Sequence, residues 1–170
     1  MARTREKRRE NASARRNPAA FIAIAVAVAV LEFLALRGGG DDGPAAVKNT
    51  DIVIPVADIS EKAGFYPAEI DGTSLEVIAV KAPDGTIRTA FNTCQVCYGS
   101  GRGYYKQDGD ALVCQNCGNR FKMSQVEIES GGCNPWPIFD ENKTVTDESI
   151  TISYDLLRQA TQIFANWKSP

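Results

Sequence analysis

Phe91-Asn-Thr-Cys94-Gln-Val-Cys97-Tyr98 is the first of two similar segments in this chain, and Val113-Cys114-Gln-Asn-Cys117-Gly118 is the second. Together they form a C-x2-C-x16-C-x2-C pattern, and each cysteine pair follows directly from an expected β-strand. A tight turn after a strand can direct two thiolates at one ion, and two such turns complete a tetrahedral four-sulfur site. The pattern therefore predicts a small β domain with two metal-binding turns, whose ligands are Cys94, Cys97, Cys114 and Cys117.

Glycines accompany both cysteine pairs. Gly118 follows Cys117 directly, and Gly99 lies two residues after Cys97. Glycine permits a positive φ, so we expect backbone N–H groups to approach the sulfurs at these turns. The aromatic residues expected to shield the centre from water are Tyr98, Tyr104, Tyr105 and Phe121.

The fifth cysteine, Cys133, lies in Gly131-Gly132-Cys133-Asn134-Pro135, which is typical of a rigid loop. This position lets Cys133 return to the site as a fifth thiolate, for ligand exchange or for a second metal. The alternative is a free buried thiol that acts as a small hydrophobe. An odd free thiol is unusual in an exported protein, so the sequence favours a role at the site.

The chain has 170 residues and no histidine. This composition excludes a Ser-His-Asp triad, a His-paired thiolate, a His-ligated haem and a Rieske centre with two His and two Cys ligands. No paired carboxylates lie in a context that suggests acid–base catalysis. A non-catalytic electron-transfer or metal-binding protein is therefore favoured over an enzyme.

The N-terminal region predicts a membrane anchor. Residues 1–17 form a basic arm with seven Lys or Arg and two Glu, so the arm carries +5 and the remainder of the chain −7. Residues 18–37 are apolar apart from Glu32 and Arg37, and a helix over the first nineteen of them rises about 28 Å, close to the hydrocarbon thickness. The positive-inside rule places the N-terminus in the cytoplasm and the rest outside, as a single-pass protein of the cell membrane.

A cleaved signal peptide is the alternative to this anchor, although the apolar run is long for one. Binding of nucleic acid by the basic arm is disfavoured, because the anchor explains its charge. Residues 38–47 are Gly-rich and predict a flexible linker. Residues 48–170 then form the extracytoplasmic cysteine-rich domain.

The local signals within that domain are mainly β. Strands are expected over residues 51–56, with Pro55 favouring an edge, over 75–81 and 86–91 around a Pro83-Asp84-Gly85 turn, over 110–113 after an Asp108-Gly109 turn, and over 149–154. The period then becomes helical, and one face of a C-terminal helix should pack against the sheet. That face comprises Leu156, Leu157, Ala160, Ile163, Phe164 and Trp167.

The spacing does not choose the occupant of the site. Four thiolates suit Zn²⁺, a single iron or an iron–sulfur cluster. Disulfides are a further alternative, because the domain is expected outside the cytoplasm and each C-x2-C could close on itself. A metal is favoured over disulfides, because both pairs share the same context of a turn after a strand.

The two segments quoted first, together with Gly103-Tyr104, Gly109-Asp110 and the loop Gly131-Gly-Cys-Asn-Pro135, resemble the bacterial Fe–S-containing membrane protein family. This family is also called FtrD-like, from its association with ferrous-iron transport, and the resemblance covers roughly residues 50–165. It implies a membrane-linked, cysteine-ligated iron–sulfur domain that passes electrons in iron uptake. Family members often carry several membrane spans, whereas one is expected here, so the implied permease would be a separate polypeptide.

The order of elements is also similar to that of Rieske-type domains, in which a strand hairpin leads to a first ligand pair, a spacer and a second pair. Cys97 and Cys117 stand where such domains carry histidines. This departure implies an all-thiolate site and, for a cluster, a lower reduction potential.

Three functions follow from these observations. The first is an anchored electron-transfer or iron-handling protein that serves a membrane transport complex. The second is an accessory subunit of a transporter with a structural zinc ion. The third is a thiol–disulfide redox protein.

Overall fold

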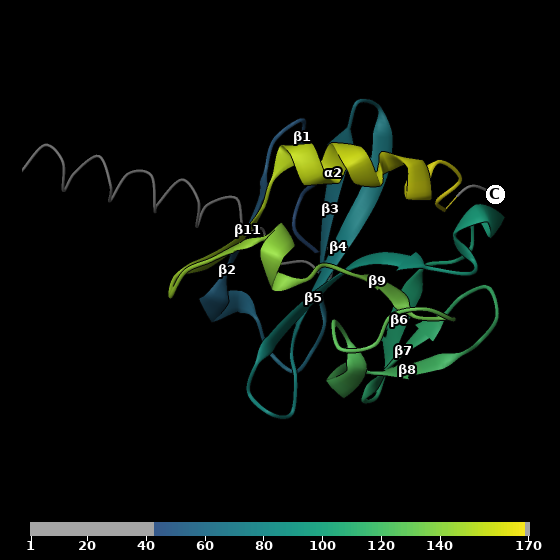
Figure 1. The fold of residues 1–170 in the computed structure, drawn as a ribbon, viewed down its shortest axis with the longest axis horizontal. Helices are drawn as coiled ribbons and strands as arrows, with labels where there is room; N and C mark the ends of the chain where they lie inside the picture. Colours follow the sequence, from purple (N-terminus) through teal and green to yellow (C-terminus); the bar gives the residue numbers. More distant parts are fainter. Residues whose placement is uncertain (1–42, 169–170) are drawn as a thin grey trace, which may run out of the picture. The chain divides into compact units, whose positions relative to one another are not determined.

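A computed structural model describes residues 43–168 as a mainly β unit with one short α-helix (Figure 1). The predicted basic arm, the membrane anchor at 18–37 and the first half of the 38–47 linker lie outside these residues. Within residues 43–168, no helix is both long and apolar enough to cross a membrane. The strands are β1 (Val47–Lys48), β2 (Ile52–Pro55), β3 (Gly64–Ile70), β4 (Thr73–Lys81), β5 (Ile87–Cys94), β6 (Tyr105–Asp108), β7 (Ala111–Cys114), β8 (Arg120–Lys122), β9 (Pro135–Pro137), β10 (Thr144–Val145) and β11 (Ser149–Ile152).

The largest sheet has five strands in the order β1-β3-β4-β5-β9. Its middle is formed by two consecutive hairpins, because β3 pairs with β4 and β4 with β5, all antiparallel. The predicted turn between β4 and β5 is confirmed, since the N–H of Gly85 donates to the carbonyl of Ala82 over 2.9 Å and Gly85 has a φ of 84°. The predicted strand over residues 86–91 extends further and ends at Cys94.

Two smaller sheets flank this one. In the sheet β10-β11-β2, strand β2 lies at the edge, as Pro55 predicted, and Ile150 of β11 is opposite Ile54 of β2. In the sheet β6-β7-β8, a hairpin joins β6 to β7 so that Tyr105 is opposite Cys114. This second hairpin is the one expected from the Asp108-Gly109 turn.

The alternation of side chains along β4 separates two hydrophobic cores. Leu75, Val77 and Ala79 point into the first core, and Ile78 and Val80 point into the second. All five residues have no exposed surface, because α2 and the β10-β11-β2 sheet contribute to the first core and the β6-β7-β8 sheet to the second. Cys94, Cys97 and Cys114 belong to the second core, and Cys133 packs against it.

The C-terminal segment packs on the first core, as predicted. Helix α2 (Tyr154–Ala160) begins with the Ser153 side chain accepting a hydrogen bond from the N–H of Leu156, and it continues as a 3-10 helix, η5 (Thr161–Phe164). Leu157 and Phe164 are buried in the first core, and Figure 1 shows α2 lying across the central strands. The expected C-terminal helix is therefore present, although its α-helical part is only seven residues long.

A buried ion pair joins β5 to the segments on either side of β9. Lys143 Nζ lies 2.6 Å from Glu127 Oε1, and the side chain of Lys143 is only 1% exposed. The other oxygen of Glu127 accepts the backbone N–H of Thr89 in β5 over 2.7 Å. This arrangement holds the chain just before the Cys133 loop against the central sheet.

Replacing Lys143 by methionine should destabilise the domain by about 3–5 kcal/mol, because it leaves the carboxylate of Glu127 buried without its partner. The measurement is urea unfolding of the reduced, metal-free protein. Lys81→Met is the control, since Lys81 is exposed at the end of β4. Equal unfolding midpoints for the two variants would contradict this role of the ion pair.

Candidate metal centre

The two cysteine pairs begin where two strands end. Cys94 is the last residue of β5, and Cys114 is the last residue of β7. Each strand is followed by a turn that carries the second cysteine of the pair, Cys97 or Cys117. The prediction that each pair follows directly from a hairpin strand is therefore confirmed.

Backbone hydrogen bonds shape the first turn. The N–H of Cys97 points at Cys94 Sγ over 3.4 Å, and the N–H of Cys94 donates to the carbonyl of Gly103 over 2.6 Å. Gly103 lies so close to the turn that a Cβ on it would be 2.5 Å from the carbonyl oxygen of Cys97. Only glycine fits there, because backbone atoms cannot move aside as a flexible side chain would.

The second turn is also closed by a backbone hydrogen bond. The N–H of Gly118 donates to the carbonyl of Cys114 over 2.9 Å, and Gly118 has the expected positive φ of 73°. The corresponding expectation for Gly99 is wrong. Gly99 lies within the 3-10 turn η2 (Tyr98–Ser100), and the following Gly101 takes the left-handed conformation at the end of that turn.

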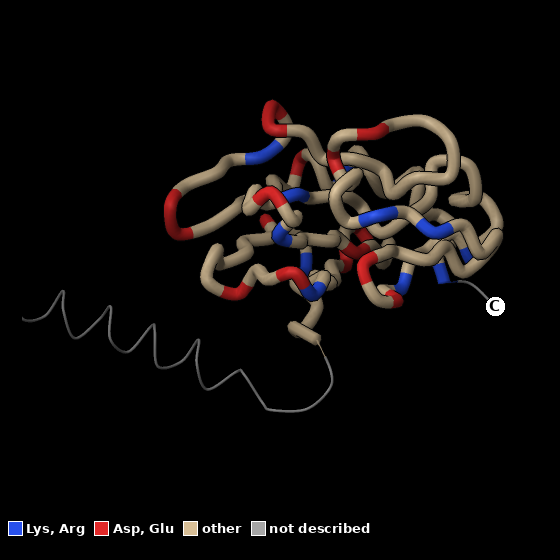
Figure 2. Tube along the Cα trace, turned by 90° about the horizontal axis from the view of Figure 1, so that it is seen from below, with Lys and Arg blue, Asp and Glu red and all other residues tan. Residues whose placement is uncertain are grey.

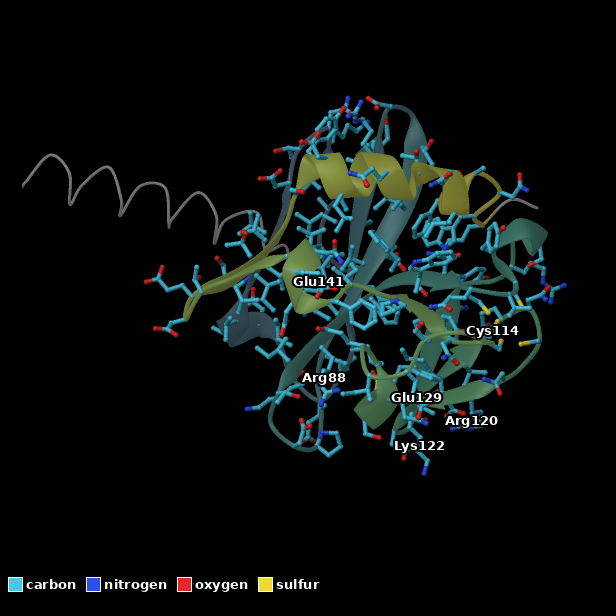
Figure 3. The ribbon with its side chains drawn as sticks, in the orientation of Figure 1. Arg88, Cys114, Arg120, Lys122, Glu129 and Glu141 are labelled. Carbon is cyan, nitrogen blue, oxygen red and sulfur yellow. The ribbon has the colours of Figure 1, made fainter. Side chains whose placement is uncertain are left out.

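Four thiols form a compact group in the second core. The Sγ atoms of Cys94, Cys97, Cys114 and Cys133 all lie within 4.8 Å of one another, and Figure 3 shows the sulfurs gathered around Cys114. The first three side chains are buried and Cys133 is half-buried. Sulfurs about 2.3 Å from one tetrahedral ion lie ~3.8 Å apart, so this group has the size and the donor chemistry to hold a metal ion.

Cys117 lies at the exposed edge of this group. Its Sγ is 2.8 Å from Cys133 Sγ, and Cys133 Sγ is 3.2 Å from Cys94 Sγ. The structure thus brings all five cysteines together, with Cys133 inside the compact group and Cys117 beside it. We call the group of Cys94, Cys97, Cys114 and Cys133 the buried tetrad.

The loop that carries Cys133 is fixed against the first turn. Gly131 and Gly132 both have a positive φ, which bends the chain back toward β5. The N–H of Gly131 donates to the Gln95 side chain over 2.6 Å, and the N–H of Gln95 donates to the carbonyl of Asn134 over 3.0 Å. The position of Cys133 is therefore set by direct contacts with the Cys94–Cys97 turn.

Tyr105 is the principal aromatic residue at the site. It is buried in the second core, and its hydroxyl donates to the carbonyl of Cys133 over 2.9 Å. Phe121 is buried in the same core, whereas Tyr98 is 42% exposed and packs edge-on against Trp136. Tyr104 is half-buried against Trp167. Of the four aromatic residues expected to shield the thiols, Tyr105 and Phe121 are the buried pair.

Asn92 and Asn119 are site residues that the motif alone does not reveal. Asn92 is buried in β5, and its side chain accepts the N–H of Tyr105 over 2.7 Å and donates to Glu76 over 2.5 Å. The side chain of Asn119 donates to the carbonyl of Cys133 over 3.1 Å. Their position relative to the cysteine pairs could have indicated them. Asn92 lies two residues before Cys94, and Asn119 lies two residues after Cys117.

The surroundings divide the thiols by acidity. Burial raises the pKa of Cys94, but hydrogen bonds from the Tyr105 hydroxyl and from backbone N–H groups outweigh it and hold that pKa below its ordinary value. Burial raises the pKa of Cys114 to about 12, and it also raises the pKa values of Cys97 and Cys133. Hydrogen bonding to Cys133 and to the backbone N–H of Asn119 lowers the pKa of Cys117 to about 7. Metal binding at the tetrad must therefore displace protons from its buried thiols.

Comparison with known proteins identifies a family that resembles most of this chain. A family model described as "Membrane iron-sulfur containing protein FtrD-like" matches residues 56–164, a region that includes all five cysteines. Neither a curated protein nor a solved structure matches this chain. The similarity to Rieske-type domains thus stays a prediction from the order of elements.

Replacing Gly103 by alanine should weaken metal binding and destabilise the domain by about 1–3 kcal/mol, because the new Cβ would overlap the backbone of Cys97. Gly99→Ala is the matched control in the same loop, since a Cβ there meets no atom within 4 Å. Unfolding midpoints and competition with a chelator measure the two effects. If the two variants behave alike, the close approach of Gly103 is not what shapes the turn.

In the reduced, metal-free protein, Cys117 should be the thiol that iodoacetamide modifies first. Its pKa of about 7 means that the reactive thiolate is present at neutral pH and is lost as the pH falls below that value. Cys94 also has a lowered pKa, but it is buried and thus shielded from the reagent. Tandem mass spectrometry of samples alkylated between pH 5 and pH 9 locates the modified residue, and Cys117→Ser should abolish the fast phase. Fastest modification at a buried cysteine would contradict this assignment.

Proposed function

The chain belongs to the FtrD-like family of membrane iron–sulfur proteins, and we propose that it is an anchored electron-transfer or iron-handling protein of a membrane transport complex. The observation that carries this proposal is the buried tetrad, whose four Sγ atoms lie within 4.8 Å of one another. Cysteine thiolates are the usual ligands of iron–sulfur clusters in proteins. When bound, such a group supplies one-electron redox chemistry.

We propose that the buried tetrad provides the ligands and that Cys117 lies beside them. Cys94, Cys97 and Cys114 are common to the tetrad and to the C-x2-C motif, so the two alternatives differ only at the fourth position. Cys133 is favoured there because it approaches Cys94 to 3.2 Å from a loop that is hydrogen-bonded to the first turn. Cys117 is exposed, which suits a thiol that exchanges with a ligand or with an incoming ion.

The surroundings of the tetrad favour a redox role. The backbone N–H of Cys97 points at Cys94 Sγ over 3.4 Å, and such donors stabilise the additional negative charge of a reduced centre. The second core excludes water from the inner side of the tetrad. These residues would set the potential of the centre and keep it dry.

The outer side of the centre is open to a partner. Val96, between the first two cysteines, is 66% exposed, and Tyr98 follows them at 42% exposure. Residues 95–126 carry four basic and two acidic side chains. Among the other described residues, acidic side chains outnumber basic ones. In Figure 2 most of the charged segments at the end of the molecule near the C-terminal label are blue, and most red segments lie further left. We therefore expect a partner with an acidic docking surface around an apolar contact.

The remaining parts of the proposal concern the membrane. The basic arm and the apolar segment at 18–37 would anchor the chain with its N-terminus in the cytoplasm and residues 48–170 outside. The partner would be a permease or another transport subunit in the same membrane. The centre would pass electrons to or from that partner, or hold iron for it.

A structural zinc ion is the second candidate. The compactness of the tetrad favours it, because four sulfurs within 4.8 Å of one another suit a single tetrahedral ion. In that case, the domain would serve the transporter only as an interaction module.

The full chain, purified anaerobically in detergent, should contain iron and show visible thiolate-to-iron charge-transfer bands. Cys133→Ser should remove the metal or shift the bands, because it takes a sulfur from the tetrad, whereas Cys117→Ser should retain both. Elemental analysis and the optical spectrum measure these effects. A colourless protein with one zinc ion would refute the electron-transfer proposal, and the opposite response of the two variants would assign the fourth ligand to Cys117.

A further inference from the structure

We propose that Cys117 and Cys133 form a reversible disulfide that opens the metal centre. The inference rests on the proposed function, because it concerns the fourth ligand of the same centre. The two Sγ atoms are 2.8 Å apart, which is roughly 0.8 Å more than the length of a disulfide bond. A small movement of either side chain is enough to join them.

Exposure singles out this pair among the five cysteines. Cys94, Cys97 and Cys114 are buried, so closure of Cys94 with Cys97 would need an oxidant inside the second core. Cys117 is exposed and Cys133 is half-buried beside it. An oxidant from solvent therefore reacts first with Cys117, and the thiol of Cys133 lies 2.8 Å from the sulfur of Cys117.

The two cysteines belong to separate segments that the fold holds together. Cys117 lies in the turn after β7, and Cys133 lies in the loop before β9. The Asn119 side chain, two residues after Cys117, donates to the carbonyl of Cys133 over 3.1 Å. The hydroxyl of Tyr105 donates to the same carbonyl over 2.9 Å, so the loop is held next to Cys117 from two sides.

The consequence for the centre does not depend on which thiol is the fourth ligand. Cys94, Cys97 and Cys114 provide three sulfurs in either case, and the fourth comes from Cys133 or from Cys117. A disulfide between these two consumes both candidates together. The ion is left with three thiolates and an open position, which weakens its binding.

The step balances as a thiol–disulfide exchange with a disulfide oxidant, either a low-mass disulfide or that of an oxidoreductase. The Cys117 thiolate attacks one sulfur of the oxidant, forms a mixed disulfide and releases the other sulfur as a thiolate. The Cys133 thiolate then attacks Cys117 Sγ and releases the second thiolate. Two electrons pass from the protein thiols to the oxidant, whose two sulfurs take up the two protons.

Peptide mapping tests the pairing without a metal. The reduced, metal-free full chain is treated with oxidised glutathione, blocked with N-ethylmaleimide and digested with trypsin without reduction. Trypsin leaves Cys94 and Cys97 within residues 89–102, Cys114 and Cys117 within 107–120, and Cys133 within 123–143. We expect residues 107–120 linked to 123–143 in the unaltered protein and in Cys114→Ser, and no such link in Cys117→Ser.

A link that persists in Cys117→Ser, or closure within residues 89–102 or 107–120 instead, would overturn the pairing. This outcome is separate from a failure of the proposed function, which would show as reduced protein that binds no iron. The mapping needs no bound metal, so either idea can fail while the other holds.

Metal release tests the consequence. Oxidised glutathione should release the metal from the loaded full chain, and dithiothreitol with added metal should restore it. Cys117→Ser is the matched control, because the proposed assignment of the fourth ligand to Cys133 leaves this variant able to bind metal. Its loaded form should keep the metal, since Cys133 then has no exposed thiol beside it. Equal release from both proteins, or none from the unaltered chain, would overturn the proposal that this disulfide opens the centre.

Discussion

The pairing of β4 with β5 gives the domain both of its cores and the starting point of its metal centre. β4 is buried on both faces, and its alternating side chains point into two different cores. β5 runs beside it and contributes Phe91 to the first core and Cys94 to the second. Because β5 ends at Cys94, the first cysteine turn begins inside the protein. A strand that slipped by one residue would move Cys94 to the other core, since side chains alternate between faces.

Buried polar groups then connect the sheet to the segments that complete the centre. Asn92 hydrogen-bonds both Glu76 of β4 and the backbone of Tyr105 in β6, which brings the second hairpin to the end of the first. Glu127 and Lys143 do the same for the chain on either side of β9. Such groups are costly to bury unless they are paired, so each one specifies a single arrangement of the segments it joins. The rigidity of the thiol cluster comes from these contacts as much as from hydrophobic packing.

The sequence predicted the elements that carry local signals and missed those that depend on distant contacts. Strand β4 and the start of β5 were visible because β-branched residues and a Pro-Asp-Gly turn mark them. Strand β3 was missed because Gly64 and Pro67 interrupt it, and Pro135–Pro137 was not predicted because two of its three residues are prolines, which lack an N–H donor. The spacing of four cysteines predicted a shared site, but it could not order Cys117 and Cys133 by depth. That order depends on a loop returning from residues 131–135 to Gln95, which no local pattern encodes.

The site has five thiols, although a tetrahedral ion needs only four sulfurs. Tight binding of an ion and access for a partner place different demands on these thiols. A closed tetrahedral shell holds an ion best when every ligand is buried and fixed, and Cys94, Cys97 and Cys114 have buried side chains. A centre that must exchange electrons or metal with a partner needs one side near solvent, and here that side carries the exposed Cys117 and the half-buried Cys133. Three buried thiols lie at the ends of β5 and β7 and in the turn after β5, while the two remaining thiols lie 2.8 Å apart at the surface. The fold thus holds the three inner thiols in place. The two thiols that can react most readily, Cys117 and Cys133, lie where solvent, a partner or an oxidant can reach them.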